Sequence, residues 1–481
     1  MSTLNSFLKR TIVYGVAAVL PKAVNVFLVG LHTKILPDTK QFNTNSEFFV
    51  WAAYFNVLLT FGMETAFFRF YNSEKSKQKV VSTTLTMVTT GALLLVLPLF
   101  WYASEVSSYL GFSQVLHFKT LLGILLFDTF VVIPFAYLRV TNRAINYALY
   151  RVLNITVYAV LNVLFLWYFP TYGGMQYLQF YPTETQVGYI FLANLIGSGV
   201  TFLMVFPMFL GFKWQLDFLL MKKMLRYSWP ILVAGLAYIT NENLDKLILP
   251  RYLDKSIAGA YAGTYKLGVF MSLFITAFKL GAEPFFFNIS NQKNAKETYA
   301  LILKWFSVLG AFIVLFIVAY IDFFASLLLK KEAYFQTLSI VPIILIANLM
   351  LGIYNNLSVW YKNTEKTQYA MYFSVLGGIL TIIGLLALVP VLGYVGAAWV
   401  TFVVYFVMMM SSYVFGQKHY KTPYEVNKIL GLLAWTMAIS FVSFYVFRNH
   451  FWINTVFLLI TLWGIYKVEQ KFIHQKFLKR S

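Results

Sequence analysis

Cysteine is absent from the 481 residues of this sequence, and charged residues make up only 12% of them. The lack of cysteine excludes disulfides, thiolate metal sites and a cysteine nucleophile. The charged fraction is far below the roughly 25% that is typical of soluble domains. Hydrophobic residues account for 59% of the chain, and its mean hydropathy is +0.69. The composition therefore predicts an integral membrane protein.

Enzyme signatures are also missing. No phosphate-binding loop of the Walker type occurs, which excludes built-in ATP hydrolysis. The five histidines stand singly, without the spacing of metal ligands. We therefore expect a transporter rather than an enzyme, with no catalytic residues, no metal and no cofactor.

Acidic residues are scarce, with 18 Asp and Glu against 38 Lys and Arg, so the formal net charge is +20. In a soluble protein this excess would suggest a nucleic-acid partner. In a membrane protein we expect the positive charge to face anionic membrane lipids instead, with no nucleic acid bound.

Long apolar stretches predict fourteen transmembrane helices, because a helix needs about 20 mostly apolar residues to cross a bilayer. Barrel strands are excluded, since these stretches do not alternate polar and apolar residues. The candidates are Thr11–Leu36, Glu47–Phe70, Val80–Ala103, Val115–Leu138, Tyr150–Phe169, Val187–Leu210, Leu225–Pro250, Ile257–Phe287, Thr298–Ile321, Thr337–Trp360, Thr367–Pro390, Gly393–Phe415, Asn427–Phe447 and Phe451–Lys467.

Lysine and arginine are concentrated in the loops on the same side as the amino terminus. This bias predicts that both termini are cytoplasmic. The first apolar stretch carries Lys22 near its middle and has no small-residue cleavage site, so we interpret it as a retained helix rather than a signal peptide. The loops are short, and no soluble domain is expected between the helices.

Two sequence motifs, called phrases below, each recur further along the chain at nearly the same number of residues. FGMETAFFRF at Phe61–Phe70 resembles LGAEPFFF from Leu280, and TNRAINYALY from Thr141 resembles TEKTQYAMY from Thr364. The offsets are 281 − 62 = 219 for the two glycines and 364 − 141 = 223 for the two threonines. An internal duplication in an apolar chain is typical of transporters.

The duplication predicts two parallel six-helix repeats around a central cavity, related by an axis along the membrane normal. We expect an N-terminal lobe at 1–210, a cytoplasmic linker at 211–224 and a C-terminal lobe at 225–415. Two additional helices and a basic cytoplasmic tail would occupy 416–481. Rigid-body rocking of the lobes would then give alternating access.

Ionisable side chains within spans are costly, at about 2.5–3.5 kcal/mol each on insertion scales, and they usually face a cavity or a partner. Lys22 and Lys266 lie near the middle of the first and eighth predicted helices. They are candidates for binding a diphosphate, since an ammonium group is a compact point charge. The alternative is that each pairs with a buried acid.

The seventh predicted helix contains the run ITNENLDKLILP. Glu242 and Lys246 are four residues apart on one helix face, an arrangement that favours an intrahelical ion pair. Alternatively, Glu242 or Asp245 forms a site for the coupling ion.

Glu64 and Glu283 occupy matching places in the two repeats, near Arg69 and Lys279 respectively. This match suggests an inner gate whose salt bridges form and break during transport. The alternative is that these charges simply reach lipid headgroups. Asp128 is the one acid of the fourth predicted helix, and we treat it as a candidate proton relay.

The duplicated arrangement, the phrase GMETAFFRF and the run NLDKLILPRYLDKSIAGAYAGTYKLG, followed by AFKLGAEPFFF, resemble the polysaccharide transporter branch of the multidrug/oligosaccharidyl-lipid/polysaccharide exporter superfamily. The resemblance covers essentially the whole chain. It implies two helical bundles around a V-shaped cavity in the bacterial inner membrane. It also implies movement of undecaprenyl-diphosphate-linked oligosaccharide, such as O-antigen units of lipopolysaccharide, to the outer leaflet, driven by H⁺ or Na⁺.

On this resemblance, the cations that contact the diphosphate correspond to Lys22 and Lys246, with Lys266 as a further candidate. Lipid II flippases carry several arginines on their first helices, whereas the first helix here has only Lys22, which argues against a peptidoglycan substrate. A drug-exporting antiporter of small amphipathic cations, a membrane glycan polymerase or ligase, and a scaffold for glycan assembly proteins are the alternatives.

Overall fold

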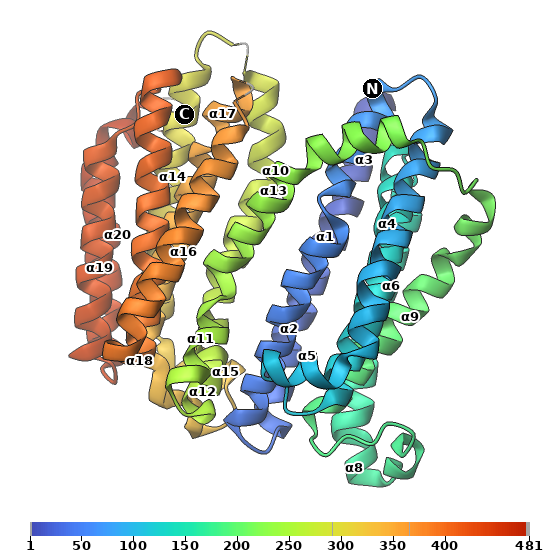
Figure 1. Ribbon diagram of the computed structural model, residues 1–481. Coiled ribbons are helices and arrows are strands. Elements are labelled where there is room, and N and C mark those ends of the chain that lie inside the picture. The colour runs from blue at the N-terminus through green and yellow to red at the C-terminus, as the bar shows by residue number, and fades with distance from the viewer. Residues whose placement is uncertain (1, 291, 365, 478–481) are drawn as a thin grey trace. The chain divides into compact units, whose positions relative to one another are not determined.

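The computed structural model describes residues 2–290, 292–364 and 366–477 (Figure 1), and all regular secondary structure in these ranges is helical. The predicted all-α membrane fold is thus confirmed. The chain divides into two compact units, residues 1–262 and 263–481. The predicted division into lobes at 210 and 225 remains a prediction.

The first unit is built around α6. This helix packs against α2, α4 and α9, while α7 packs against α1 and α9, and α10 packs against α2 and α3. Large buried side chains, among them Phe67 and Met224, form a core between these helices. The helices are α1 (Ser2–Ile35), α2 (Thr39–Thr60), α3 (Met63–Ser73), α4 (Lys77–Trp101), α5 (Ala103–Leu110), α6 (Val115–Val140), α7 (Ala144–Val163), α8 (Phe169–Tyr172), α9 (Val187–Gly211), α10 (Phe218–Asn243), α11 (Asp245–Tyr252) and α12 (Lys255–Tyr265), which crosses the unit boundary.

The second unit is built around α16, nearly all of whose side chains are buried. It packs against α18 and α14, and α14 in turn contacts α19 and α20. A short 3₁₀ turn, Lys266–Gly268, precedes the first full helix of the unit. The helices are α13 (Val269–Ile289), α14 (Ala295–Ala319), α15 (Ile321–Leu328), α16 (Val341–Leu357), α17 (Val359–Asn363), α18 (Gln368–His419), α19 (Val426–Tyr445) and α20 (Phe451–Phe477).

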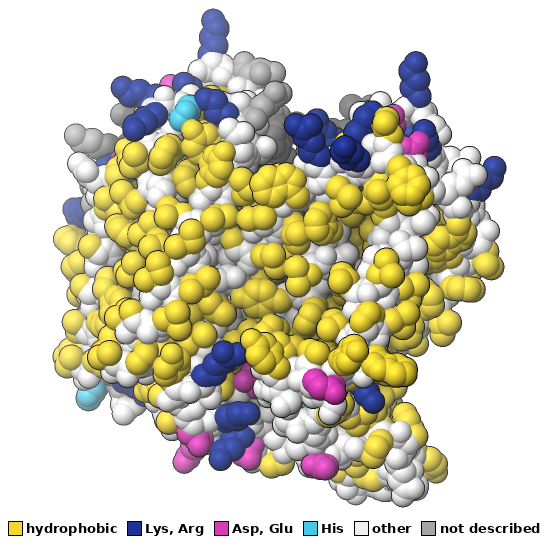
Figure 2. Space-filling model, in the orientation of Figure 1, with side chains coloured by type: hydrophobic (Ala, Val, Ile, Leu, Met, Phe, Trp, Pro, Cys, Tyr) yellow, Lys and Arg dark blue, Asp and Glu magenta, His cyan; other side chains and the backbone are white. Residues whose placement is uncertain are grey.

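The described residues contain ten helices that are long and apolar enough to cross a membrane, so the predicted number of fourteen spans remains a prediction. One reason for the difference is α18, a helix of 52 residues that contains two predicted spans. Gly393 interrupts it with non-helical backbone angles, φ 59° and ψ −139°. On the face that Figure 2 shows, hydrophobic side chains cover the middle of the view, and lysine and arginine side chains gather toward its top and bottom.

The first repeated phrase marks a break in a helix. The predicted span Glu47–Phe70 is present, but Phe61 and Gly62 adopt left-handed backbone angles and divide it into α2 and α3. A Cβ atom on Gly62 would lie 3.0 Å from the Ile231 side chain, so close approach of α10 and positive φ both favour glycine. The matching Gly281 lies inside the unbroken helix α13. The two repeats therefore use the same phrase in different backbone conformations.

The start of α10 is fixed by a charged cap. The Asp217 carboxylate accepts a hydrogen bond of 2.7 Å from the Leu220 backbone N–H, and it forms an ion pair with Lys79 of α4. The Lys79 ammonium and the backbone N–H of Leu220 lower the pKa of Asp217 below its ordinary value. This contact ties the segment that follows α9 to α4.

Candidate functional site

A polar cavity of about 350 Å³ lies within the first unit, between α2, α3, α6, α7 and α9. Polar and ionisable side chains inside a membrane-spanning bundle are expensive, and they commonly mark a pathway for a substrate or an ion. The polar residues that line the cavity are Asn56, Thr60, Glu64, Thr65, Asp128, Tyr147, Arg151, Asn154, Asn194, Ser198 and Thr201.

Asp128 of α6 lies in the wall of this cavity, as a proton relay or ion site would require. Its carboxylate interacts with the Ser198 hydroxyl and is attracted by the charge of Arg151. The Arg151 guanidinium lies 5.2 Å from the centre of the Phe135 ring. A carboxylate that interacts with a hydroxyl and a guanidinium can hold a proton or a small cation and can exchange it for a contact with arginine.

Glu64 lies at the edge of the same cavity, on the first turn of α3. Its carboxylate accepts a hydrogen bond of 2.7 Å from Arg139 of α6. Arg69, which the sequence suggested as its neighbour, instead lies over the Tyr227 ring at 4.3 Å. The ion pair thus connects the ends of two helices rather than two positions on one helix.

The charged run of the seventh predicted helix forms a buried cluster. Lys246 pairs with Asp245 at 3.1 Å and donates a hydrogen bond of 2.9 Å to the Glu242 backbone carbonyl. The Tyr261 hydroxyl donates a hydrogen bond of 2.6 Å to the other oxygen of Asp245. The Glu242 side chain interacts with the Tyr238 hydroxyl. These contacts occur where α10 gives way to α11, so the run is not one regular helix.

The three lysines predicted to contact a diphosphate have different surroundings. Lys22 is exposed on α1, Lys246 is buried, and Lys266 is exposed in the short turn before α13. Their role in binding a diphosphate remains a prediction.

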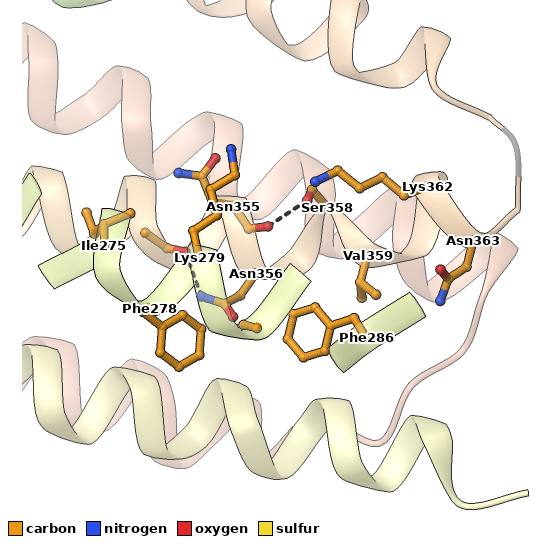
Figure 3. Close-up of a pocket in the computed structure, with 12 residues that line it drawn as sticks. Ile275, Phe278, Lys279, Phe286, Asn355, Asn356, Ser358, Val359, Lys362 and Asn363 are labelled. Atoms are coloured by element: carbon orange, nitrogen blue, oxygen red, sulfur yellow. Dashed lines mark hydrogen bonds between the residues drawn. The ribbon is translucent and has the colours of Figure 1, made fainter. Parts of the chain in front are cut away.

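In the second unit, a shallow pocket lies between α13, α16 and α17 (Figure 3). Lys279, one of the predicted gate residues, lines this pocket together with Lys362, Asn355, Asn356 and Asn363. Its predicted companion Glu283 belongs to α13, but its side chain lies outside the described part of the chain.

Sequence reasoning missed Arg139, Arg151 and Lys362. Two of them could have been found by extending the repeat, since 362 − 139 = 223 is the offset of the repeated threonines. Arg151 gives no such signal, because it stands at the edge of a predicted span.

A four-charge network in the second unit was also missed. Lys304 of α14 contacts Glu425 at 2.8 Å and Glu469 of α20 at 2.7 Å. Lys428 of α19 forms ion pairs with the same two carboxylates, Glu469 at 3.2 Å and Glu425, so the four side chains form a closed ring. The residues are widely separated in the sequence, so only the packing of α14, α19 and α20 brings them together.

The fold has close counterparts among solved structures of membrane exporters. A lipid II flippase, MurJ, in an inward closed conformation matches with a TM-score of 0.73, covering 96% of this chain and 100% of that chain at 15% identity. An inward-facing multidrug transporter of the MATE family matches with a TM-score of 0.64 over 86% of this chain and 95% of that chain, at 13% identity. A transporter from Pyrococcus furiosus matches with a TM-score of 0.56 over 88% of this chain and 96% of that chain, at 14% identity.

These matches show that the chain has the same helical fold as MurJ and as a MATE transporter, the second of which is described as a member of the MOP superfamily. The family model described as "Polysaccharide biosynthesis protein" matches residues 8–290, which is more than half of the chain. The chain therefore belongs to this family, and the resemblance noted in the sequence is confirmed. No curated protein matches the sequence.

Proposed function

We propose that the protein is a flippase that moves undecaprenyl-diphosphate-linked oligosaccharide from the cytoplasmic to the outer leaflet of the bacterial inner membrane. The observation that carries this proposal is a polar, charged cavity inside a helical exporter fold that matches a lipid II flippase along its whole length. The match to the polysaccharide biosynthesis family supports a glycan rather than a drug as the cargo.

The proposed mechanism is alternating access with an ion gradient as its energy source. Asp128 takes up H⁺ or Na⁺ and thereby gives up its attraction to Arg151, which changes the electrostatic balance inside the cavity. The Asp245–Lys246 pair and the Glu64–Arg139 pair are the further charged contacts that such a cycle would make and break. Lys22, Lys246 and Lys266 are assigned to the diphosphate.

A second candidate function is ion-coupled export of small amphipathic cations. The carboxylates of Asp128 and Glu64 in one cavity favour it, because acidic side chains attract cationic molecules. The MATE transporters among the structural matches have the same fold.

The test is translocation of a fluorescent undecaprenyl-diphosphate oligosaccharide in liposomes that contain only this protein, with and without a pH or Na⁺ gradient. We expect transport by the wild type, loss of its gradient dependence in Asp128→Asn, and no change in Glu105→Gln, which alters an acid outside the cavity. Export of an amphipathic cation under the same gradient, without movement of the lipid, would contradict the flippase and support the second candidate.

A further inference from the structure

The chain that leads into α10 and the first turns of this helix form a surface that is both basic and apolar. We call residues 213–229 the entry segment. Figure 1 shows the first turns of α10 running across the end of the first unit beside α3, with which α10 packs. Tryptophans stand near both ends of the segment, Trp214 at 51% and Trp229 at 52% exposure. Its exposed cations are Lys213, Lys222, Lys223 and Arg226.

One face of the entry segment is attached to the first unit. Leu220, Met224 and Ser228 recur every four residues, and all three side chains are buried. The Arg69 guanidinium of α3 lies over the Tyr227 ring at 4.3 Å. Since residues four apart share one face of a helix, these contacts turn the opposite face of the segment away from the unit.

That opposite face carries large apolar side chains beside the cations. Phe218 and Leu219 are each 71% exposed, and Lys222, Lys223 and Arg226 follow within the next two turns. Within the described part of the chain, α10 is not one of the ten helices that are long and apolar enough to cross a membrane. A helix that combines basic residues with exposed aromatic and aliphatic ones is typical of the membrane interface.

The charge of the entry segment is strongly positive. Its one acid, Asp217, is already engaged by Lys79 of α4. The charge bias of the loops assigns this segment to the cytoplasmic side, where the leaflet is rich in anionic lipids. That bias alone would explain the lysines, but it does not explain the exposed phenylalanine, leucine and tryptophans beside them. The combination fits a segment that lies in the interface itself.

We propose that the entry segment is a docking surface for anionic phospholipid headgroups of the cytoplasmic leaflet. Phe218 and Leu219 enter the region where the acyl chains begin, while the ammonium groups of Lys222 and Lys223 contact the phosphates. Trp214 and Trp229 mark the depth of the interface at the two ends of the segment. Anionic lipid is then a partner of this protein whichever cargo is moved, and it holds the start of α10 from the side opposite to α3.

The experiment measures lipid contact at a single fluorescent label. Because the chain has no cysteine, Gln215→Cys in the full-length protein provides one labelling site within the entry segment, and Gln215 is exposed. The labelled protein is placed in nanodiscs of phosphatidylcholine that contain either brominated phosphatidylglycerol or brominated phosphatidylcholine at the same mole fraction. We expect stronger quenching by brominated phosphatidylglycerol, and a preference that decreases as salt is raised.

Variants test whether the lysines cause the preference. Lys222→Gln and Lys223→Gln together should lower the preference for phosphatidylglycerol by about fivefold for each lysine removed. Lys222→Arg and Lys223→Arg should keep it, because the charge is retained. The matched control is Lys418→Gln with Lys421→Gln, two exposed lysines of the second unit, which should leave the preference unchanged. A preference that survives the glutamine pair, or that falls equally in the control, would overturn the assignment to these lysines.

The remaining outcomes decide between other occupants of the surface. Equal quenching by the two brominated lipids would overturn headgroup recognition. A label that neither lipid quenches would place the segment in water, open to a soluble partner, and would overturn the interfacial position. Displacement of brominated phosphatidylglycerol by an equal amount of undecaprenyl diphosphate would assign the surface to the cargo and overturn a phospholipid site. Since the readout is lipid contact rather than transport, failure of the flippase function would not change these results.

Discussion

Asp245 and Lys246 are neighbours in the sequence and form an ion pair of 3.1 Å in which each side chain is only 6% exposed. The Tyr261 hydroxyl donates a hydrogen bond to the second oxygen of the Asp245 carboxylate, so the ammonium, carboxylate and hydroxyl groups all have partners inside the first unit. Burial of such a pair gives little net stability, but removal of one partner leaves the other as an uncompensated charge.

Lys246→Met should therefore lower the free energy of unfolding by about 3–5 kcal/mol, since the Asp245 carboxylate would remain buried with less compensation. The double variant Asp245→Asn, Lys246→Met should recover part of that loss. Denaturant unfolding in detergent measures both values. A double variant less stable than the single one would contradict a buried, charge-compensated pair.

The Glu64–Arg139 pair should behave differently, because its side chains are 44% and 42% exposed. Pairs of this exposure contribute only about 0.2–1 kcal/mol to stability. We expect Glu64→Gln to leave thermal unfolding nearly unchanged while it reduces transport, if the pair acts as a gate. The charge swap Glu64→Arg, Arg139→Glu should restore part of the transport, and an equally inactive swap would argue against a gating contact.

The two repeated glycines provide a matched pair of substitutions. Gly62→Ala should lower the free energy of unfolding by about 1–3 kcal/mol, because φ is +67° there and the new Cβ would lie 3.0 Å from Ile231. Gly281→Ala should be neutral or stabilising by up to about 1 kcal/mol, since Gly281 is helical and has open space beside it. Equal effects at both positions would contradict the broken helix in the first unit.

The cap of α10 predicts a dependence on pH. Contact with Lys79 and the Leu220 N–H lowers the pKa of Asp217 in the folded protein, so its stabilising effect is present above the ordinary aspartate pKa. The effect is lost as the pH falls through the lowered folded-state pKa. The difference in melting temperature between wild type and Asp217→Asn should thus be constant near neutral pH and vanish in acid. Asparagine is also a good N-cap residue, so the comparison measures the effect of the Asp217 charge alone. A difference in melting temperature that persists in acid would contradict stabilisation by this charge.

The sequence predicted those features that depend on composition and regular spacing. The length of the apolar stretches identified the helices. In a lipid-exposed segment, a helix satisfies the backbone N–H and C=O groups by hydrogen bonds within the segment itself. The duplication drew attention to Glu64 and Lys279, and the structure places Glu64 on the first turn of α3 and Lys279 within α13, each lining a pocket of its own unit. The same reasoning placed Asp128 within a span, and that residue lines the cavity.

Partners across helices could not be predicted in this way. Glu64 pairs with Arg139 of α6 rather than contacting Arg69, because Glu64 and Arg69 are five residues apart on α3 and therefore do not face each other. The pairing of Asp245 with Lys246 depends on an interruption between α10 and α11. These two ion pairs depend on packing between distant helices and on breaks in the backbone. Neither can be predicted from the spacing of residues along one regular helix.

The ring of Lys304, Glu425, Lys428 and Glu469 affects how far the chain could be shortened. The last two helices lie beyond the duplicated part, and it is tempting to treat them as removable. Yet the nearly buried Lys304 side chain of α14 forms ion pairs with two carboxylates from this region, Glu425 at 2.8 Å and Glu469 at 2.7 Å. A chain cut after residue 415 would strip both acids from an ammonium group inside the bundle. We therefore expect the smallest stable form of this protein to extend at least to Glu469, with α19 and α20 as part of its core.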